Sequence, residues 1–245
     1  MTNQLQSSPL EGQKVLIVGG TSGIGLSAAL QAKAAGAEVT VLGSDPARAA
    51  QIAAEHGLAG WLSADVTRPD TIEATLSGVA HVDHLVLLAG SFAVGKVLEA
   101  DLARLHRAFD ERVWAAVHIL RALGDRLAPD ASITFISGAL GDRPNGYGTA
   151  VLAAASSAME SLARGLALEL APRRVNTLSP GPIDTPLLGK ALGDGRDSYV
   201  AQLQQKLPLH RLGTPEEAGA AVVFLMANGF MNGATLNIDG GSRLV

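Results

Sequence analysis

A glycine-rich turn carries the clearest chemical signal in the sequence. It follows the apolar run KVLIV, and its glycines are spaced G-x-x-x-G-x-G. Glycine lets such a turn bend tightly and lets its backbone approach a phosphate, while the free amides at the start of the next helix bind phosphate oxygens. A plain strand-to-helix turn has a similar composition, so the motif needs support from the rest of the chain. The residues of this turn that we assign to dinucleotide binding are Gly19, Thr21, Ser22, Gly23, Ile24 and Gly25.

Two patterns alternate along the chain around this turn. Short runs rich in branched apolar residues, typical of buried strands, are separated by Ala- and Leu-rich segments of helical length. Regular alternation of this kind predicts an α/β fold, namely a Rossmann-like doubly wound parallel sheet of about seven strands with helices on both faces. The strand-like runs are residues 14–18, 38–42, 84–88, 132–137, 174–179 and 235–238.

No linker, repeat or low-complexity segment divides the chain, so we expect residues 1–245 to form a single dinucleotide-binding domain. The polar start, residues 1–12, is expected to be a flexible tail. Residues 180–198 follow a strand and show no clear pattern. We expect them to form a substrate lid, because long segments of this kind often cover the ligand of an α/β enzyme.

Composition and charge exclude several classes of protein. The chain has a formal net charge of -4 and no cysteine, so disulfides and thiolate chemistry are ruled out and nucleic acid is not an expected partner. No signal-peptide pattern is present, and no apolar run reaches the ~18 residues of a membrane span, so we expect no membrane association. The histidines lack metal-ligand spacing, so no metal site is expected. The expectation is a cytoplasmic protein that binds a small-molecule substrate.

Further segments, taken with the glycine-rich turn, resemble the short-chain dehydrogenase/reductase family over nearly the whole chain. ADV follows the third strand, LLAG stands where the family has N-N-A-G, and SPGPIDTP matches its P-G-x-x-x-T segment. GTPEEAGAAVVFLM and GATLNIDGG match its last helix and strand. The resemblance implies a nicotinamide cofactor, with adenine contacted after the third strand and nicotinamide covered by the P-G segment. The residues that it assigns to the cofactor are Asp65, Val66, Ala89, Gly90, Pro180, Gly181, Ile183 and Thr185.

The end of the second strand bears on the choice between NADP(H) and NAD(H). An acidic residue there would bind the ribose 2′-hydroxyl and repel a 2′-phosphate. That position is Gly43, the next is Ser44, and Arg48 lies one helical turn further on. We therefore expect Ser44 and Arg48 to contact the cofactor and NADP(H) to be preferred, with NAD(H) as the alternative. In the other interpretation Arg48 is a solvated helix residue and Asp45 merely caps that helix.

Most of the residues that the family uses for catalysis are replaced. Counted back from ESLARGLALELAP, the tyrosine position holds Leu152 and the lysine position holds Ser156. The family's asparagine position, in FDERVWAAVHIL, holds Arg112. The serine strand ends in FISG, which leaves Ser137 or Gly138 at the serine position.

Three side chains are candidates for an altered catalytic site. Arg112 cannot donate a proton because its pKa is too high, but its charge can stabilise a developing alkoxide. Ser137 can add a hydrogen bond, and Tyr147 is the aromatic hydroxyl in the loop after the serine strand. The alternatives are an ion pair between Arg112 and a carboxylate such as Asp110 or Glu111, and a packing role for Tyr147.

Two functions from different classes follow. The first is an NADP(H)-dependent oxidoreductase that reduces a carbonyl- or imine-like small molecule with this altered site. The second is a catalytically degenerate protein that senses NADP(H) or serves as a structural subunit. The family resemblance further implies a homotetramer or homodimer, packed through the helices around Arg112 and Ser156.

Overall fold

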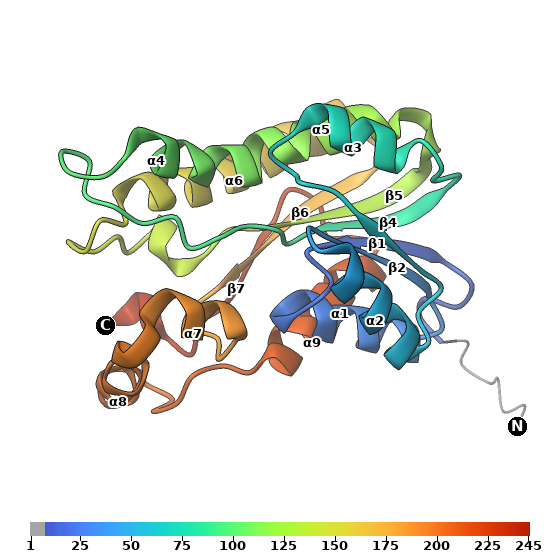
Figure 1. The fold of residues 1–245 in the computed structure, drawn as a ribbon. Helices are drawn as coiled ribbons and strands as arrows, with labels where there is room; N and C mark the ends of the chain where they lie inside the picture. Colours follow the sequence, from blue (N-terminus) through green and yellow to red (C-terminus); the bar gives the residue numbers. More distant parts are fainter. Residues whose placement is uncertain (1–7) are drawn as a thin grey trace, which may run out of the picture.

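A parallel sheet of seven strands runs through the computed structural model, which describes residues 8–245 (Figure 1). Its strand order, β3-β2-β1-β4-β5-β6-β7, reverses between β1 and β4, and in doubly wound folds ligands bind beyond the carboxyl ends of the strands at such a reversal. The predicted fold class is confirmed. The strands are β1 (Lys14–Val18), β2 (Glu38–Gly43), β3 (Gly60–Ser63), β4 (Val82–Leu87), β5 (Leu127–Ile136), β6 (Arg174–Pro180) and β7 (Thr235–Ile238).

Helices cover both faces of this sheet. In Figure 1 α3, α4, α5 and α6 lie on one face and α1, α2 and α9 on the other, while α7 and α8 stand apart near the end of β7. The helices are α1 (Gly23–Ala34), α2 (Pro46–His56), α3 (Pro69–Leu76), α4 (Leu102–Phe109), α5 (Ala115–Leu123), α6 (Ala150–Glu169), α7 (Pro186–Leu192), α8 (Arg196–Lys206) and α9 (Pro215–Ala227).

Alternation along the strands divides the core into two layers. Leu85 and Phe135 point to the face covered by α5 and α6, whereas Ile17 and Val86 point to the face covered by α1 and α9. All four side chains are fully buried. Because both faces are covered, the strands read as continuous apolar runs, and this is why they could be found in the sequence.

Part of the expected N-terminal tail is folded. Leu10 is 0% exposed and packs in the layer under α1 and α9. Its amide donates to the carbonyl of Ala35, and the amide of Gly12 donates to that of Gly36. The expectation of a flexible tail is therefore wrong for residues 8–12, because Leu10 fills a gap in the core; residues 1–7 lie outside the described part of the chain.

The expected lid at residues 180–198 is mostly helical. It contains the end of β6, the whole of α7 and the first residues of α8, which continues to Lys206. Pro186 at the start of α7 follows Thr185 in extended conformation, as is usual for proline in the first turn of a helix. The absence of an apolar stripe in this segment reflects the position of both helices outside the two core layers.

A buried histidine on β4 predicts how stability depends on pH. His84 contacts the Ser132 hydroxyl at 2.6 Å and the Gln13 side-chain oxygen at 2.7 Å. Burial lowers its pKa to about 4, against a smaller opposing effect of Asp83. In the unfolded chain the imidazole takes up a proton near its ordinary pKa of about 6.5, whereas in the folded protein it stays neutral until about 4.

We therefore expect the free energy of unfolding to fall as the pH drops from about 6.5 to about 4. This histidine contributes at most about 1.4 kcal/mol per pH unit. Urea unfolding of the protein and of His84→Gln across this range measures the effect, and the difference between their slopes isolates His84 from the carboxylates. Equal slopes would show that the imidazole is not held neutral.

Candidate functional site

The glycine-rich turn between β1 and α1 has no room for side chains. A Cβ added at Gly25 would overlap the carbonyl oxygen of Gly19. Gly19 itself has a φ of +84°, and a Cβ there would lie 2.7 Å from the backbone nitrogen of Ala89 at the end of β4. The turn is thus pressed against the end of β4, and the first amides of α1 are left for a ligand beyond the sheet. The cradle fits a dinucleotide pyrophosphate.

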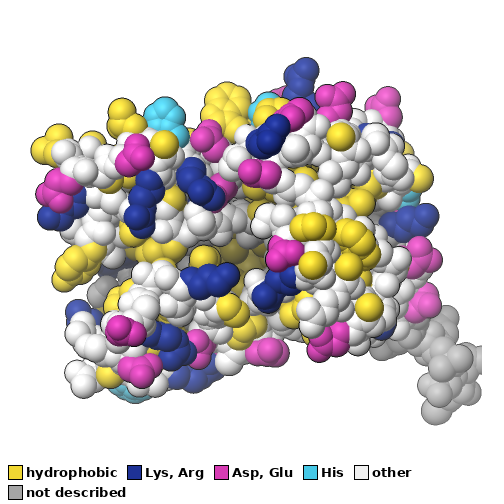
Figure 2. Space-filling model, in the orientation of Figure 1, with side chains coloured by type: hydrophobic (Ala, Val, Ile, Leu, Met, Phe, Trp, Pro, Cys, Tyr) yellow, Lys and Arg dark blue, Asp and Glu magenta, His cyan; other side chains and the backbone are white. Residues whose placement is uncertain are grey.

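The loop after β6 closes on this turn from the opposite side. A Cβ at Gly23 would lie 3.2 Å from Cγ2 of Thr185, so the start of α7 lies directly over the start of α1. Gly181, in the same loop, is packed against the backbone of Asp239 after β7. Figure 2 shows this face hollowed at its centre, with hydrophobic side chains on the floor and Lys and Arg side chains on the rim. The structure therefore brings together the turn and the P-G segment, as the sequence predicted.

The end of β2 lacks a carboxylate that could hold a ribose. Gly43 ends the strand, and Ser44 and Arg48 are exposed beside the turn. Arg48 donates from Nε to the carbonyl of Thr21 at 3.3 Å, so its guanidinium lies next to the glycine-rich turn. Asp45 also caps α2 by accepting from the Arg48 amide. The capping expected in the alternative interpretation is present, and it does not remove Arg48 from the site.

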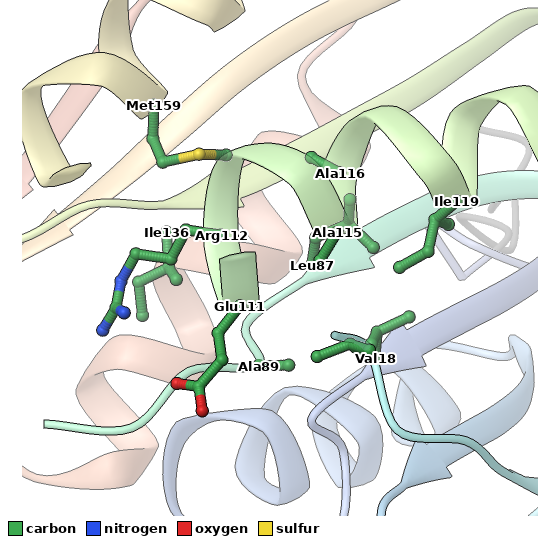
Figure 3. Close-up of a pocket in the computed structure, with 11 residues that line it drawn as sticks. Val18, Leu87, Ala89, Glu111, Arg112, Ala115, Ala116, Ile119, Ile136 and Met159 are labelled. Atoms are coloured by element: carbon green, nitrogen blue, oxygen red, sulfur yellow. The ribbon is translucent and has the colours of Figure 1, made fainter. Parts of the chain in front are cut away.

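The adenine side of the expected site has a different character. Asp65 accepts hydrogen bonds from the amide and the hydroxyl of Thr67, and these lower the pKa of its carboxyl. Val66 and Ala89 line an apolar cavity together with Val18 at the ends of β1 and β4 (Figure 3). This cavity has a volume of only about 10 Å³, so it holds no more than about one water molecule and is not itself a pocket for a ring system.

Arg112 also lines this cavity and lies on an irregular helical turn. Residues Asp110–Trp114 form a π-helix between α4 and α5, and π-helical turns are frequent at functional sites. Nη2 of Arg112 donates to the carbonyl of Ser91 at 2.9 Å, and a Cβ at Gly90 would lie 3.0 Å from Cζ. In Figure 3 its guanidinium points away from the apolar end of the cavity. Within residues 8–245 no carboxylate forms an ion pair with it.

The neighbouring Glu111 is engaged elsewhere. Its carboxylate accepts from the Ser91 hydroxyl at 2.6 Å and from Arg107 at 2.7 Å. Burial would raise the pKa of Glu111, but these hydrogen bonds and the Arg107 charge lower it overall. Burial likewise lowers the pKa of Arg112, with a smaller opposing effect of Glu111. Nη1 of Arg112 also donates to the Ala108 carbonyl at 3.5 Å, so two backbone carbonyls hold this largely buried guanidinium. No ion pair with Asp110 or Glu111 forms in the described chain, so that alternative is wrong.

The positions of the missing tyrosine and lysine are filled by packing. Leu152 is only 3% exposed and packs in a small apolar cluster with Ala93 and Ala155. Ser156 is also buried, and its hydroxyl donates to the carbonyl of Leu152 within α6. Neither side chain presents a proton donor to the cleft.

Two of the candidate catalytic hydroxyls have different environments. Tyr147 is 86% exposed on the loop before α6, and its phenol has no hydrogen-bond partner in the described chain, so the structure does not bring it into the cleft. Ser137, directly after β5, donates from Oγ to Oε1 of Glu160 at 2.8 Å. A Cβ at Gly138 would instead face the carbonyl of Pro180, in the P-G segment after β6.

Sequence reasoning missed Glu160. The signal was available, because Glu160 follows Leu152 and Ser156 at intervals of four residues and so shares their face of α6. Among residues 8–245 no cluster of His, Asp and Glu could hold a metal ion, and no helix is long and apolar enough to cross a bilayer.

Comparison with known proteins agrees with this geometry. Residues 18–243 match the family model described as enoyl-(acyl carrier protein) reductase. The chain is 32% identical to "Short-chain dehydrogenase/reductase ATR9" from Stachybotrys chlorohalonatus, over 96% of this chain and 98% of that protein. It is 33% identical to "Cyclic-di-GMP-binding biofilm dispersal mediator protein" from Escherichia coli, over 94% and 96% of the two chains.

A solved structure is similar over the same range. A "small-chain dehydrogenase in complex with NADPH" superimposes with a TM-score of 0.82 at 30% identity, covering 96% of this chain and 100% of that chain. The fold, the family model and these relatives define an oxidoreductase scaffold. The chain belongs to the short-chain dehydrogenase/reductase family.

Proposed function

We propose that the protein is an NADP(H)-dependent oxidoreductase that reduces a carbonyl- or imine-like small molecule in the cytoplasm with an altered active site. The observation that carries this proposal is the close packing of the glycine-rich turn between β1 and α1. Its glycines leave no space for side chains, and Thr185 covers Gly23. The absence of a carboxylate at Gly43, together with Arg48 beside the turn, favours the 2′-phosphate of NADP(H).

The bound nicotinamide supplies a hydride, and the chain must then manage the negative charge on the substrate. Arg112 can stabilise charge on the substrate oxygen, because its guanidinium carries no ion pair in the described chain and is held in place by the Ser91 and Ala108 carbonyls. Such preorganised charge acts without rearrangement as the oxygen becomes an alkoxide. A protonated imine would need no proton from the protein at all.

A second candidate function is a protein that binds NADP(H) without turnover. It is favoured by the buried Leu152 and Ser156, which leave no acid at the family's tyrosine and lysine positions. The Escherichia coli relative is named for binding cyclic-di-GMP, which supports a binding role as the alternative.

One experiment separates the two candidates. NADPH oxidation is followed with a panel of aldehydes, ketones, imines and quinones, beside a fluorescence titration of NADPH. Turnover with any member supports the oxidoreductase, and we expect simple ketones to be slow, because a missing general acid typically lowers rates ~10²–10⁴-fold. Binding with no turnover across the panel supports the binding protein.

The Arg48 side chain provides the test of cofactor preference. We expect NADPH to bind more tightly than NADH, and Arg48→Ala to weaken NADPH by about tenfold, or ~1.4 kcal/mol, while NADH changes little. Arg68→Ala is a matched control, because Arg68 pairs with Asp70 on the surface. If Arg48→Ala loses NADPH affinity and NADH affinity equally, Arg48 does not bind the 2′-phosphate. Gly43→Asp is a poorer test, since its Cβ would lie 2.7 Å from Cγ2 of Thr21 and disturb the turn.

We also propose a homodimer or homotetramer packed through the helices around Arg112 and Ser156. Trp114 is 54% exposed on the π-helix of this layer, and Leu168 on α6 is 84% exposed. Burial of such side chains is a driving force for association. Sedimentation of the unmodified protein and of the Trp114→Glu variant measures this association.

A further inference from the structure

The hydroxyl of Ser137 belongs to a polar cluster between the sheet and α6. The Ser137 amide is held by the Leu178 carbonyl at 2.9 Å, so the residue stays in register at the end of β5. Its Oγ donates to Oε1 of Glu160 at 2.8 Å. Both residues are partly exposed. A carboxylate oxygen can only accept when ionised, so this hydroxyl proton is directed at a group able to take it up.

Glu160 is held in place by a second hydroxyl. Ser179, at the end of β6, contacts the same Oε1 atom at 3.3 Å and accepts from Nη2 of Arg243 at 2.6 Å. Arg243 also pairs with Asp239 and Asp142, so its charge is balanced by two carboxylates. No Lys, Arg or His of residues 8–245 forms an ion pair with Glu160. The Glu160 carboxylate is therefore oriented by two hydroxyl groups and forms no ion pair within the described residues.

The position of Glu160 on α6 relates it to the missing catalytic pair. Leu152, Ser156 and Glu160 lie at i, i+4 and i+8, one above another on one side of α6. Leu152 is apolar, and the Ser156 hydroxyl donates to the carbonyl of Leu152 within the helix. Glu160 is the one carboxyl on this stripe, and it contacts Ser137, the serine that directly follows β5.

We propose that Ser137 and Glu160 form the proton relay of the altered site, with Ser137 as the catalytic residue and Glu160 as a positioning residue that acts through it; this rests on the proposed function. In reduction the carbonyl carbon receives the hydride that NADPH supplies, and the C=O π electrons move to oxygen. Solvent protonates Glu160 before the hydride step; the substrate oxygen then takes the Ser137 hydroxyl proton while Ser137 takes the proton of the neutral Glu160 carboxyl, which restores the carboxylate that accepts from Ser137 at rest. The products are the alcohol and NADP⁺, and in the reverse direction the carboxylate is the final base.

The test follows the pH dependence of kcat with benzaldehyde and 9,10-phenanthrenequinone as probes. Glu160→Gln keeps an oxygen for Ser137 but cannot carry a proton. We expect it to lower kcat ~10²-fold and to change how kcat depends on pH relative to the unmodified protein. NADPH affinity, measured by fluorescence, should stay unchanged in the variant and in the control Glu55→Gln, whose carboxyl is exposed.

A second variant covers failure of the first to fold. Ser137→Ala removes one hydroxyl and should give the same loss, and the double variant should lose no more than either single one, because the two groups act as a unit. Glu160→Gln with ordinary kcat and pH profile overturns the relay and leaves the proposed function standing. No turnover by the unmodified protein with the whole panel overturns the function and the relay together. A crystal structure with NADPH and benzyl alcohol should place the alcohol oxygen within hydrogen-bonding distance of Ser137 Oγ, and an oxygen bound elsewhere overturns the relay.

Discussion

Replacing Arg112 by methionine is expected to lower kcat by about 10²-fold, the loss typical for removal of one fixed oxyanion donor. Methionine keeps the apolar stem that packs along the π-helix but removes the guanidinium over Gly90. The Ser91 loop stays in place, because Glu111 holds its amide and its hydroxyl independently. NADPH affinity should therefore change little, and kcat and affinity are measured separately with the most active substrate of the panel.

A matched control strengthens this comparison. Arg104→Met removes an exposed cation from α4 on the same helical layer and should leave kcat unchanged. If Arg112→Met also leaves kcat unchanged, the cation has no catalytic role. If only thermal stability or the oligomeric state changes, and the unmodified protein shows no turnover, the binding-protein interpretation is the correct one.

Replacing Gly25 by alanine is expected to weaken NADPH binding by about 10²-fold, or ~2.7 kcal/mol. The new Cβ would overlap the carbonyl oxygen of Gly19, and backbone cannot rotate out of the way as a side chain can. The start of α1 must then move away from β1, which moves the amides that face the pyrophosphate. Overpacking should also lower the free energy of unfolding by about 1–3 kcal/mol.

Fluorescence titration and thermal unfolding measure these two effects. Gly78→Ala is a suitable control, because a Cβ there meets nothing within 4 Å and its φ is not positive. It should leave both the affinity and the melting temperature close to those of the unmodified protein. Ordinary NADPH affinity in Gly25→Ala would show that the cofactor does not bind at this turn.

The elements that carry apolar runs could be predicted from the sequence. Residues 14–18 coincide with β1, because a strand buried on both faces consists almost entirely of branched apolar residues. Residues 235–238 coincide with β7, an only partly buried edge strand. The start of β5 at Leu127 was missed, since Pro129 and Asp130 interrupt the apolar pattern there. The glycine spacing was informative for a physical reason, namely that only glycine fits the contact between Gly19 and Ala89.

The altered part of the site was less predictable. No local pattern in DERVW marks the π-helix that carries Arg112, because the extra residue in the turn is accommodated by packing around it. The partner of Ser137 is Glu160, which lies 23 positions away on another element. Sequence periodicity gives the face of a helix but not the strand end against which that face is packed. Tyr147 lies in a loop, where exposure depends on contacts that the sequence does not encode locally.

The apolar cluster around Leu152 bears on whether a tyrosine could be restored at this position. A single reversion of Leu152 to tyrosine would place a larger, polar side chain against Ala93 and Ala155, in a space that is already filled. Overpacking of this kind costs about 1–3 kcal/mol, a substantial part of the stability of an ordinary domain. The benefit of the phenol would come only with a lysine at Ser156, which is buried as well. A tyrosine and a lysine at these two buried positions would therefore need compensating substitutions in the residues that pack around them.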